Sequence, residues 1–142
     1  MIKRSANATW KGDLKEGKGK FSLESGIVSD ASYSFGTRFG EDKGSNPEEL
    51  LAAAHASCFS MAFAHGLSSA GFKVNSIHTV DKVLMEKSDS GFTIKTIEIN
   101  TEGDVEDISK DDFQKYAEDA KKNCPIARAV TGVEFVLKAT LK

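Results

Sequence analysis

Two cysteines are the residues of this chain with the greatest potential for chemistry. Cys58 and Cys124 are the only cysteines among the 142 residues. Two thiols are too few for a disulfide scaffold, and they are too widely separated for a zinc ribbon. They are therefore either inert core residues, which is the usual fate of a free cysteine, or a pair that carries redox chemistry.

Cys58 lies in the middle of an apolar segment in which residues 51–71 carry no charged side chain. Burial in apolar surroundings disfavours the thiolate, so a reactive Cys58 requires a nearby cation. The chain has only three arginines, Arg4, Arg38 and Arg128. Arg38 is flanked by aromatic residues, which indicates partial burial, although a solvated position on an edge strand is an alternative. A guanidinium about 4 Å from the sulfur would favour the thiolate by roughly 4 kcal/mol at an effective dielectric constant near 20.

Cys124 directly precedes Pro125, a residue typical of the first helical position. Its thiol is therefore predicted at the N-terminus of a short helix, where the helix dipole favours the thiolate. A capping residue without a redox role fits the same pattern. His55, three residues before Cys58, could join both cysteines in a metal site. Three ligands without a second histidine or acid are a weak pattern, and a core histidine is the commoner outcome.

The hydrophobic pattern predicts the elements that must position these residues in one domain, residues 1–142. Asn46-Pro47-Glu48-Glu49 is a strong helix start, and Gly71 ends that helix. The expected order is a β-meander over 1–45, a central helix over 47–70, a β-hairpin over 73–102, and C-terminal helices and a strand over 109–142.

Several local expectations follow from the same pattern. Residues 33–39 read as a strand, and a change of phase after Ile94 predicts a β-bulge before Ile97. Ser109 opens the next helix as an imperfect capping box. A short helix follows over 125–130, and residues 133–141 alternate as a final strand.

Composition excludes several classes of function. The net charge of −2 gives no basic surface for nucleic acid or an anionic membrane. The N-terminus lacks the apolar stretch of a secretory signal, so a cytoplasmic protein is expected. The apolar segment after Leu50 is long enough to span a bilayer, but it is rich in alanine and contains two histidines, which favours a buried helix. Its apolar residues surround it on nearly every side, which indicates burial within a dimer.

The run from Gly44 to Met61, Gly-Ser-Asn-Pro-Glu-Glu-Leu-Leu-Ala-Ala-Ala-His-Ala-Ser-Cys-Phe-Ser-Met, resembles the signature of the OsmC/Ohr family, and most closely its OsmC branch. Shorter matches extend the resemblance over nearly the whole chain. They are Trp10-Lys11-Gly12-Asp13, Gly17-Lys18-Gly19, Glu24-Ser25-Gly26, Thr37-Arg38-Phe39, Ala70-Gly71-Phe72 and Asn123-Cys124-Pro125.

This resemblance implies an α+β fold in which antiparallel sheets wrap long central helices in an intertwined homodimer. It also implies a thiol peroxidase that reduces organic hydroperoxides in preference to hydrogen peroxide, with a dithiol such as a reduced lipoyl group as reductant. By matching motifs, Cys58 is the peroxidatic cysteine, Cys124 the resolving cysteine, Arg38 the group that stabilises the thiolate, and Glu48 the carboxylate partner of Arg38. No metal or other cofactor is needed.

The same resemblance led to two finer expectations. Met61, Phe35 and Phe39 would supply an apolar wall for an alkyl tail. Glu48 precedes Cys58 by ten residues, which is about 15 Å along one helix, so Glu48 is expected to reach the site from the partner subunit.

Two other classes of function remain open from the sequence. A noncatalytic binding protein or dimer scaffold with a static disulfide would consume little peroxide. A metal-dependent hydrolase would copurify with zinc and lose activity with a chelator.

Overall fold

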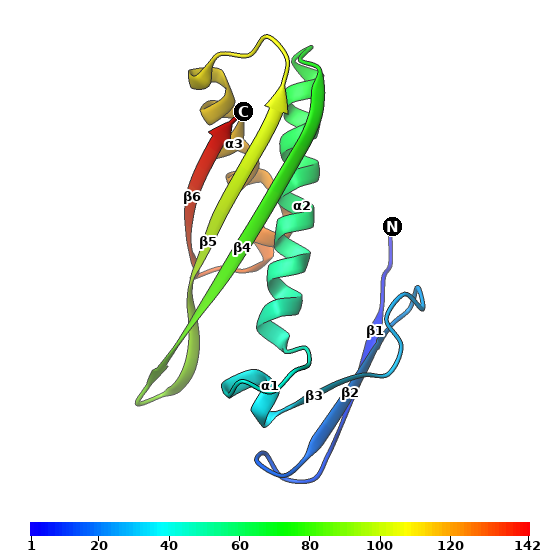
Figure 1. Ribbon diagram of the computed structural model, residues 1–142. Helices are drawn as coiled ribbons and strands as arrows, with labels where there is room; N and C mark the ends of the chain where they lie inside the picture. The colour runs from blue at the N-terminus through cyan, green and yellow to red at the C-terminus, as the bar shows by residue number, and fades with distance from the viewer. The chain divides into compact units, whose positions relative to one another are not determined.

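The first 50 residues form a three-stranded antiparallel sheet followed by a short helix. The computed structural model describes residues 1–142 and comprises two compact units, residues 1–50 and 51–142. In the first unit the sheet has the order β1-β2-β3 (Figure 1). Its elements are β1 (Ala6–Lys11), β2 (Lys18–Leu23), β3 (Ala31–Ser34) and the helix α1 (Phe35–Phe39).

The predicted strand over residues 33–39 is wrong beyond Ser34, where the chain turns into α1. The Ser34 hydroxyl accepts a hydrogen bond from the Thr37 amide, and the Thr37 hydroxyl accepts one from the Ser34 amide. This capping box satisfies backbone donors that would otherwise favour continued strand pairing. Arg38 therefore lies on a helix and not on an edge strand.

The long helix α2 (Pro47–Ser69) agrees with the predicted central helix. Asn46 precedes it, and the Asn46 side-chain oxygen accepts a hydrogen bond from the Glu49 amide at 2.8 Å. Pro47 occupies the first helical position, where its missing N–H costs nothing. The helix ends before Gly71, whose φ of +93° suits glycine and allows the Phe72 amide to bond the Leu67 carbonyl.

The second unit contains a sheet of order β4-β5-β6. Its strands are β4 (Val74–Ser88), β5 (Gly91–Val105) and β6 (Glu134–Leu141). β4 and β5 form an antiparallel hairpin in which Leu84 pairs with Thr96 but Met85 pairs with Ile94. The extra residue on β5 is Lys95, so the predicted bulge is confirmed.

The expectation of purely antiparallel sheets is wrong for β6, which pairs with β5 in parallel. The connection contains α3 (Lys110–Asn123) and α4 (Pro125–Ala129), which return the chain to the starting end of the sheet. Parallel neighbours require such a long crossover connection. Ser109 caps α3 as predicted, accepting a hydrogen bond from the Asp112 amide.

The core of the second unit lies between the sheet and the helices α2 and α3 (Figure 1). Phe63 of α2 packs on Phe113 of α3 with ring centroids 4.9 Å apart. By length and composition α2 could cross a membrane, but one stripe of it is fully buried against its own chain. The main buried apolar residues are Phe59, Phe63, Leu67, Ile97, Ile99, Phe113 and Ala117.

Candidate active site

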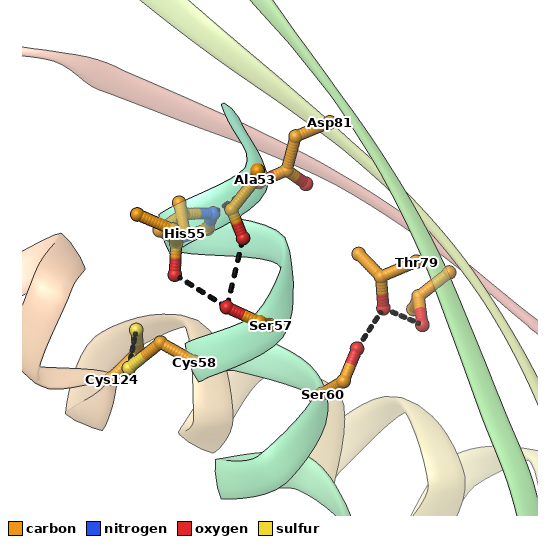
Figure 2. A network of polar contacts seen from close by, with 10 residues as sticks. Ala53, His55, Ser57, Cys58, Ser60, Thr79, Asp81 and Cys124 are labelled. Carbon is orange, nitrogen blue, oxygen red and sulfur yellow. Dashed lines mark hydrogen bonds and ion pairs between the residues drawn. The ribbon is translucent and has the colours of Figure 1, made fainter. Parts of the chain in front are cut away.

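The two cysteines are brought together in the second unit. Cys58 projects from the middle of α2, and Cys124 lies at the junction of α3 and α4 (Figure 2). The Cys124 thiol donates a hydrogen bond to the sulfur of Cys58, with the two Sγ atoms 2.7 Å apart. Both residues are free cysteines, 66 positions apart in sequence. A disulfide needs about 2.05 Å between its sulfurs, so a shift of less than 1 Å (about 0.65 Å) would join them.

Cys124 is fixed by backbone contacts at both helix ends. Its amide donates to the Ala120 carbonyl at 2.9 Å, and its carbonyl accepts from the Arg128 amide at 3.1 Å. Pro125 occupies the first position of α4, as the sequence predicted. Cys124 is therefore the C-cap of α3 and the N-cap of α4.

Burial raises the pKa of the Cys124 thiol to about 11, and the hydrogen bond to Cys58 acts in the same direction. The backbone amides of Ala127 and Ile126 lower that pKa, but they do not outweigh the burial. The helix end thus favours the Cys124 thiolate as expected, but burial outweighs it. Cys124 therefore stays protonated at neutral pH, and its S–H forms a hydrogen bond to the sulfur of Cys58. Cys58 is the more exposed of the two cysteines.

Arg38 and Glu48 form an ion pair in the first unit. The Arg38 Nη2 lies 2.7 Å from Glu48 Oε1, and Nε lies 3.2 Å from both carboxylate oxygens. The Arg38 side chain is 35% exposed and that of Glu48 is 13% exposed. The guanidinium also stands 5.0 Å from the centre of the Phe39 ring. The predicted partnership of Arg38 and Glu48 is therefore present as a contact within one chain.

The loop between α1 and α2 holds this ion pair in place. Thr37 donates its hydroxyl to the Ser45 carbonyl at 2.8 Å, and Asn46 donates its side-chain amide to the Thr37 carbonyl at 3.2 Å. Asn46 thereby caps α2 and also contacts α1. The two residues of the pair come from the last turn of α1 and the first turn of α2, whose ends are tied together by these bonds.

An apolar pocket of about 250 Å³ adjoins Arg38. Arg38 is its one charged lining residue; the others are Trp10, Leu14, Tyr33, Ser34, Phe35, Phe39 and Pro47. Phe35 and Phe39 lie beside Arg38 in this pocket, whereas Met61 is 75% exposed on α2 and does not line it.

Leu14 reaches the pocket from the loop between β1 and β2. The Trp10 indole donates to the carbonyls of Gly12 and Asp13 at 3.1 and 3.2 Å, which anchors this loop. A side chain at Gly17 would meet the indole nitrogen at 2.7 Å and the Asp13 carbonyl at 2.2 Å, so only glycine fits there.

His55 is a buried residue with an acidic partner and does not join the cysteines. Its Nδ1 contacts Asp81 Oδ2, and both side chains are fully buried. No group of three or more histidine, cysteine or acidic residues is arranged to hold a metal ion. The imagined metal site of His55, Cys58 and Cys124 is therefore not formed.

Comparison with known proteins identifies the family. The sequence model described as OsmC-like protein matches residues 40–138. Over 141 residues the chain is 43% identical to peroxiredoxin OsmC of Escherichia coli strain K12, covering 99% of this chain and 98% of that relative. The chain belongs to the OsmC-like protein family.

Two further relatives of this OsmC-family chain extend the comparison. The organic hydroperoxide resistance protein OhrB of Bacillus subtilis is 32% identical over 91 residues, which are 63% of this chain and 64% of OhrB. A solved structure of an OsmC-like protein of unknown function from Vibrio cholerae has a TM-score of 0.76 at 21% identity, covering 98% of this chain and 99% of that one. The latter likeness shows that the OsmC-like fold is shared.

Sequence reasoning missed two features of this OsmC-family site. Trp10 of β1 and Tyr33 of β3 line the pocket with ring centroids 5.4 Å apart, and a single aromatic residue on each strand is their only signal in the sequence. The contact of His55 with Asp81 had no signal in sequence, because the two residues lie 26 positions apart on different elements.

Proposed function

We propose that this OsmC-family protein is a thiol peroxidase that reduces organic hydroperoxides to alcohols. The observation that carries the proposal is the 2.7 Å approach of the Cys58 and Cys124 sulfurs within one chain. The names of its relatives, a peroxiredoxin in Escherichia coli and an organic hydroperoxide resistance protein in Bacillus subtilis, support the same reaction.

Cys58 is the peroxidatic cysteine of this proposal. Its thiolate attacks the outer peroxide oxygen, the O–O bond breaks, and the alkoxide takes a proton from solvent to leave as an alcohol. The sulfur is oxidised to sulfenic acid, and the peroxide is reduced by two electrons. The raised pKa of Cys124 supports this division, because the thiol that keeps its proton is the poorer nucleophile.

Cys124 is the resolving cysteine. Its sulfur attacks the sulfenic sulfur of Cys58, hydroxide leaves with the thiol proton as water, and a disulfide forms. An external dithiol then attacks the disulfide, and its second thiol displaces the mixed disulfide to restore both cysteines. A lipoyl-type dithiol fits this requirement for two linked thiols.

Arg38 stabilises the Cys58 thiolate and the developing negative charge on the peroxide oxygen, and Glu48 orients its guanidinium. Glu48 engages Nε and Nη2, so the remaining Nη1 is not used by the carboxylate. We propose that these two residues serve the Cys58 of the partner subunit in a homodimer. The supporting argument is length, since ten helical residues separate Glu48 from Cys58 by about 15 Å.

The pocket beside Arg38 receives the organic part of the substrate. Its lining is almost entirely apolar, and its volume of about 250 Å³ suits an alkyl or aryl group. Hydrogen peroxide has no apolar group to bury and would gain nothing from this pocket. The protein would thus act as an antioxidant in the cytoplasm during oxidative stress.

The test is peroxide consumption by the reduced protein with dihydrolipoamide as the electron donor. Cumene hydroperoxide should be consumed faster than hydrogen peroxide, and a monothiol donor should support slower turnover. A protein that consumed neither peroxide above the rate of its Cys58→Ser variant would contradict the proposal.

A further inference from the structure

Two polar contacts join α2 to the edge strand β4 on either side of Cys58 (Figure 2). Before the cysteine, His55 Nδ1 contacts Asp81 Oδ2. After it, the Ser60 hydroxyl donates to the Thr79 hydroxyl at 2.8 Å. We call these two contacts the polar ties.

The His55–Asp81 tie leaves buried polar atoms without partners, which lowers the stability of the fold, so a gain in stability does not explain the tie. Both side chains are fully buried, and His55 Nε2 and Asp81 Oδ1 have no hydrogen-bond partner in the protein. Replacing a buried ion pair by apolar residues is often neutral or stabilising, whereas the best-attested use of such pairs is to fix the register of packed elements. The pair therefore indicates a requirement for register.

The surroundings of the tie are uncharged. The His55 ring packs on Phe135 of β6 with centroids 4.9 Å apart, and on Phe59 at 6.2 Å. The neighbouring inward-facing residues on the three strands are Thr79 and Val83 of β4, Ile97, Ile99 and Thr101 of β5, and Phe135 and Leu137 of β6. Along the helix, the next titratable side chain is Cys58 itself.

The polar ties add to the rotation of α2 that its buried stripe of Phe59, Phe63 and Leu67 sets. The remaining apolar residues surround the helix on nearly every side, many of them alanines, and distinguish little between rotations about the helix axis. At about 100° per residue, His55 and Ser60 lie about 140° apart and flank the buried stripe of Phe59 and Phe63. Rotation in either direction would lengthen one of the polar ties.

The spacing of the two polar ties also matches along the axis. Five helical residues from His55 to Ser60 rise about 7.5 Å, and two strand residues from Asp81 to Thr79 span roughly 7 Å. Sliding α2 by one residue would therefore break both contacts. The polar ties fix both the rotation and the height of the helix at Cys58.

The chemistry at Cys58 is sensitive to that rotation. A sulfur roughly 4 Å from the helix axis moves by about 1.4 Å when the helix turns by about 20°. The Cys58 and Cys124 sulfurs are 2.7 Å apart, and Cys124 is fixed separately by α3 and α4. A rotation of this size would thus move the Cys58 sulfur by more than the distance over which the two sulfurs must close to bond.

We propose that the His55–Asp81 pair, supported by the Ser60–Thr79 contact, is a positioning site that holds Cys58 in register for disulfide formation with Cys124. This inference rests on the proposed roles of the two cysteines. His55 and Asp81 act through the helix and do not contact the reacting atoms.

The test replaces the buried pair by apolar residues, in the double variant His55→Leu with Asp81→Val. Its unfolding temperature should equal or exceed that of the unchanged protein, because the unpaired buried polar atoms are gone. Disulfide formation with diamide, which takes the two thiol hydrogens, should nevertheless slow by about tenfold or more. After treatment with cumene hydroperoxide, mass spectrometry should find Cys58 sulfinic acid in place of part of the disulfide.

Ser68→Ala is the matched control, because the Ser68 hydroxyl bonds only the Ala64 and His65 carbonyls of its own helix. It should close the disulfide at the unchanged rate. If the double variant did not fold, Ser60→Ala with Thr79→Val would remove the second tie with little change in shape. Closure at the unchanged rate in either folded variant would overturn the inference.

The diamide reaction separates this inference from the proposed function, because it uses no hydroperoxide. Slow closure in the variant would support positioning even if the unchanged protein reduced no hydroperoxide. That second result would overturn the peroxidase activity alone.

Discussion

The Arg38–Glu48 and His55–Asp81 pairs differ in where they lie and in what holds them. Arg38 and Glu48 are partly exposed, and they come from helix ends tied by loop hydrogen bonds. His55 and Asp81 are fully buried between a 23-residue helix and a 15-residue strand. The first pair can meet a substrate and keep its charge in partial contact with water. The second is enclosed by its own chain, where the His55 ring also packs on Phe135 of β6.

In the proposed mechanism, this contrast would separate two demands of one reaction. Charge stabilisation acts over several ångströms and tolerates some movement, so a loop and a five-residue helix are sufficient. Bond formation between two sulfurs tolerates a displacement of less than 1 Å. Cys58 lies on the long helix α2, and Cys124 lies at the junction of α3 and α4. The predictions below test this division, beginning with the largest expected effect.

Loss of a sulfur should have the largest effect of all. Cys58→Ser should reduce organic hydroperoxide consumption to background. Cys124→Ser should permit about one turnover and then accumulate sulfinic acid at Cys58, because no thiol remains to capture the sulfenic acid. Mass spectrometry after one equivalent of hydroperoxide checks both variants. Unoxidised Cys58 in the Cys124→Ser protein would refute the assigned roles.

Loss of the guanidinium should rank next. Arg38→Ala should slow alkylation of Cys58 at pH 7 by about one to two orders of magnitude, since roughly 4 kcal/mol of attraction at close range, less the cost of desolvation, lowers a thiol pKa by about one to two units. Arg38→Lys should also be impaired, because an ammonium cannot present the same planar fork. Alkylation rates across pH provide the measurement, with Arg4→Ala as a control for the loss of a guanidinium. Equal rates in the Arg38 and Arg4 variants would remove Arg38 from the site.

Subunit exchange tests whether the exposed pair serves the partner. Cys58→Ser protein should be inactive and Glu48→Ala protein impaired, but random mixing would make about half of all dimers mixed, with both defects in one site and none in the other. About a quarter of all sites would then be intact. Peroxidase assays before and after exchange, with exchange verified by mass spectrometry, provide the measurement. Verified exchange without recovery would place Glu48 and Cys58 in the same site from one chain.

The apolar pocket should produce a smaller change that depends on the substrate. Leu14→Ala removes an exposed wall of the pocket, so kcat/KM for cumene hydroperoxide should fall several-fold while that for hydrogen peroxide stays constant. Steady-state kinetics with both peroxides measure the ratio. Equal losses for both peroxides would show that Leu14 affects the fold or the cysteines and not selectivity.

The smallest effect concerns alkaline stability of the reduced protein. The pKa of Cys124 is raised to about 11 from 9.0, so the folded state holds this proton after the unfolded chain has lost it. The resulting contribution to stability is complete below pH 9 and is lost as the pH rises toward 11. Denaturant unfolding of reduced protein at pH 8 and pH 10.5 should show this loss, and Cys124→Ser should show less of it. The same loss in both proteins would assign it to other groups.

Local patterns predicted the elements of this fold better than its pairings. Asn46 and Pro47 specified the start of α2, and the change of phase around Lys95 specified the bulge in β5. These signals lie within a few residues of the feature they describe. The parallel pairing of β6 depends instead on where α3 and α4 return the chain, and no local pattern records that.

The candidate site shows the same limit. The family resemblance supplied all four proposed site residues, and two pairwise contacts among them are present. The helix-end effect on Cys124 is visible in sequence, whereas the depth of burial that outweighs it is not. Asp81 was missed because a lone acid in an alternating strand resembles a solvent-facing residue until its face is known.

The separation of the two cysteines along the chain links turnover to resistance against unfolding. A bond between sulfurs 66 positions apart would close a long loop, and such loops restrict the unfolded chain by about 4 kcal/mol. By thermodynamic coupling, the folded chain favours its disulfide by the same amount, which corresponds to roughly 90 mV of reduction potential. Oxidised molecules should therefore survive heat and proteases longer than reduced ones. Exposure to hydroperoxide would place the protein in its most durable form for as long as reductant is scarce.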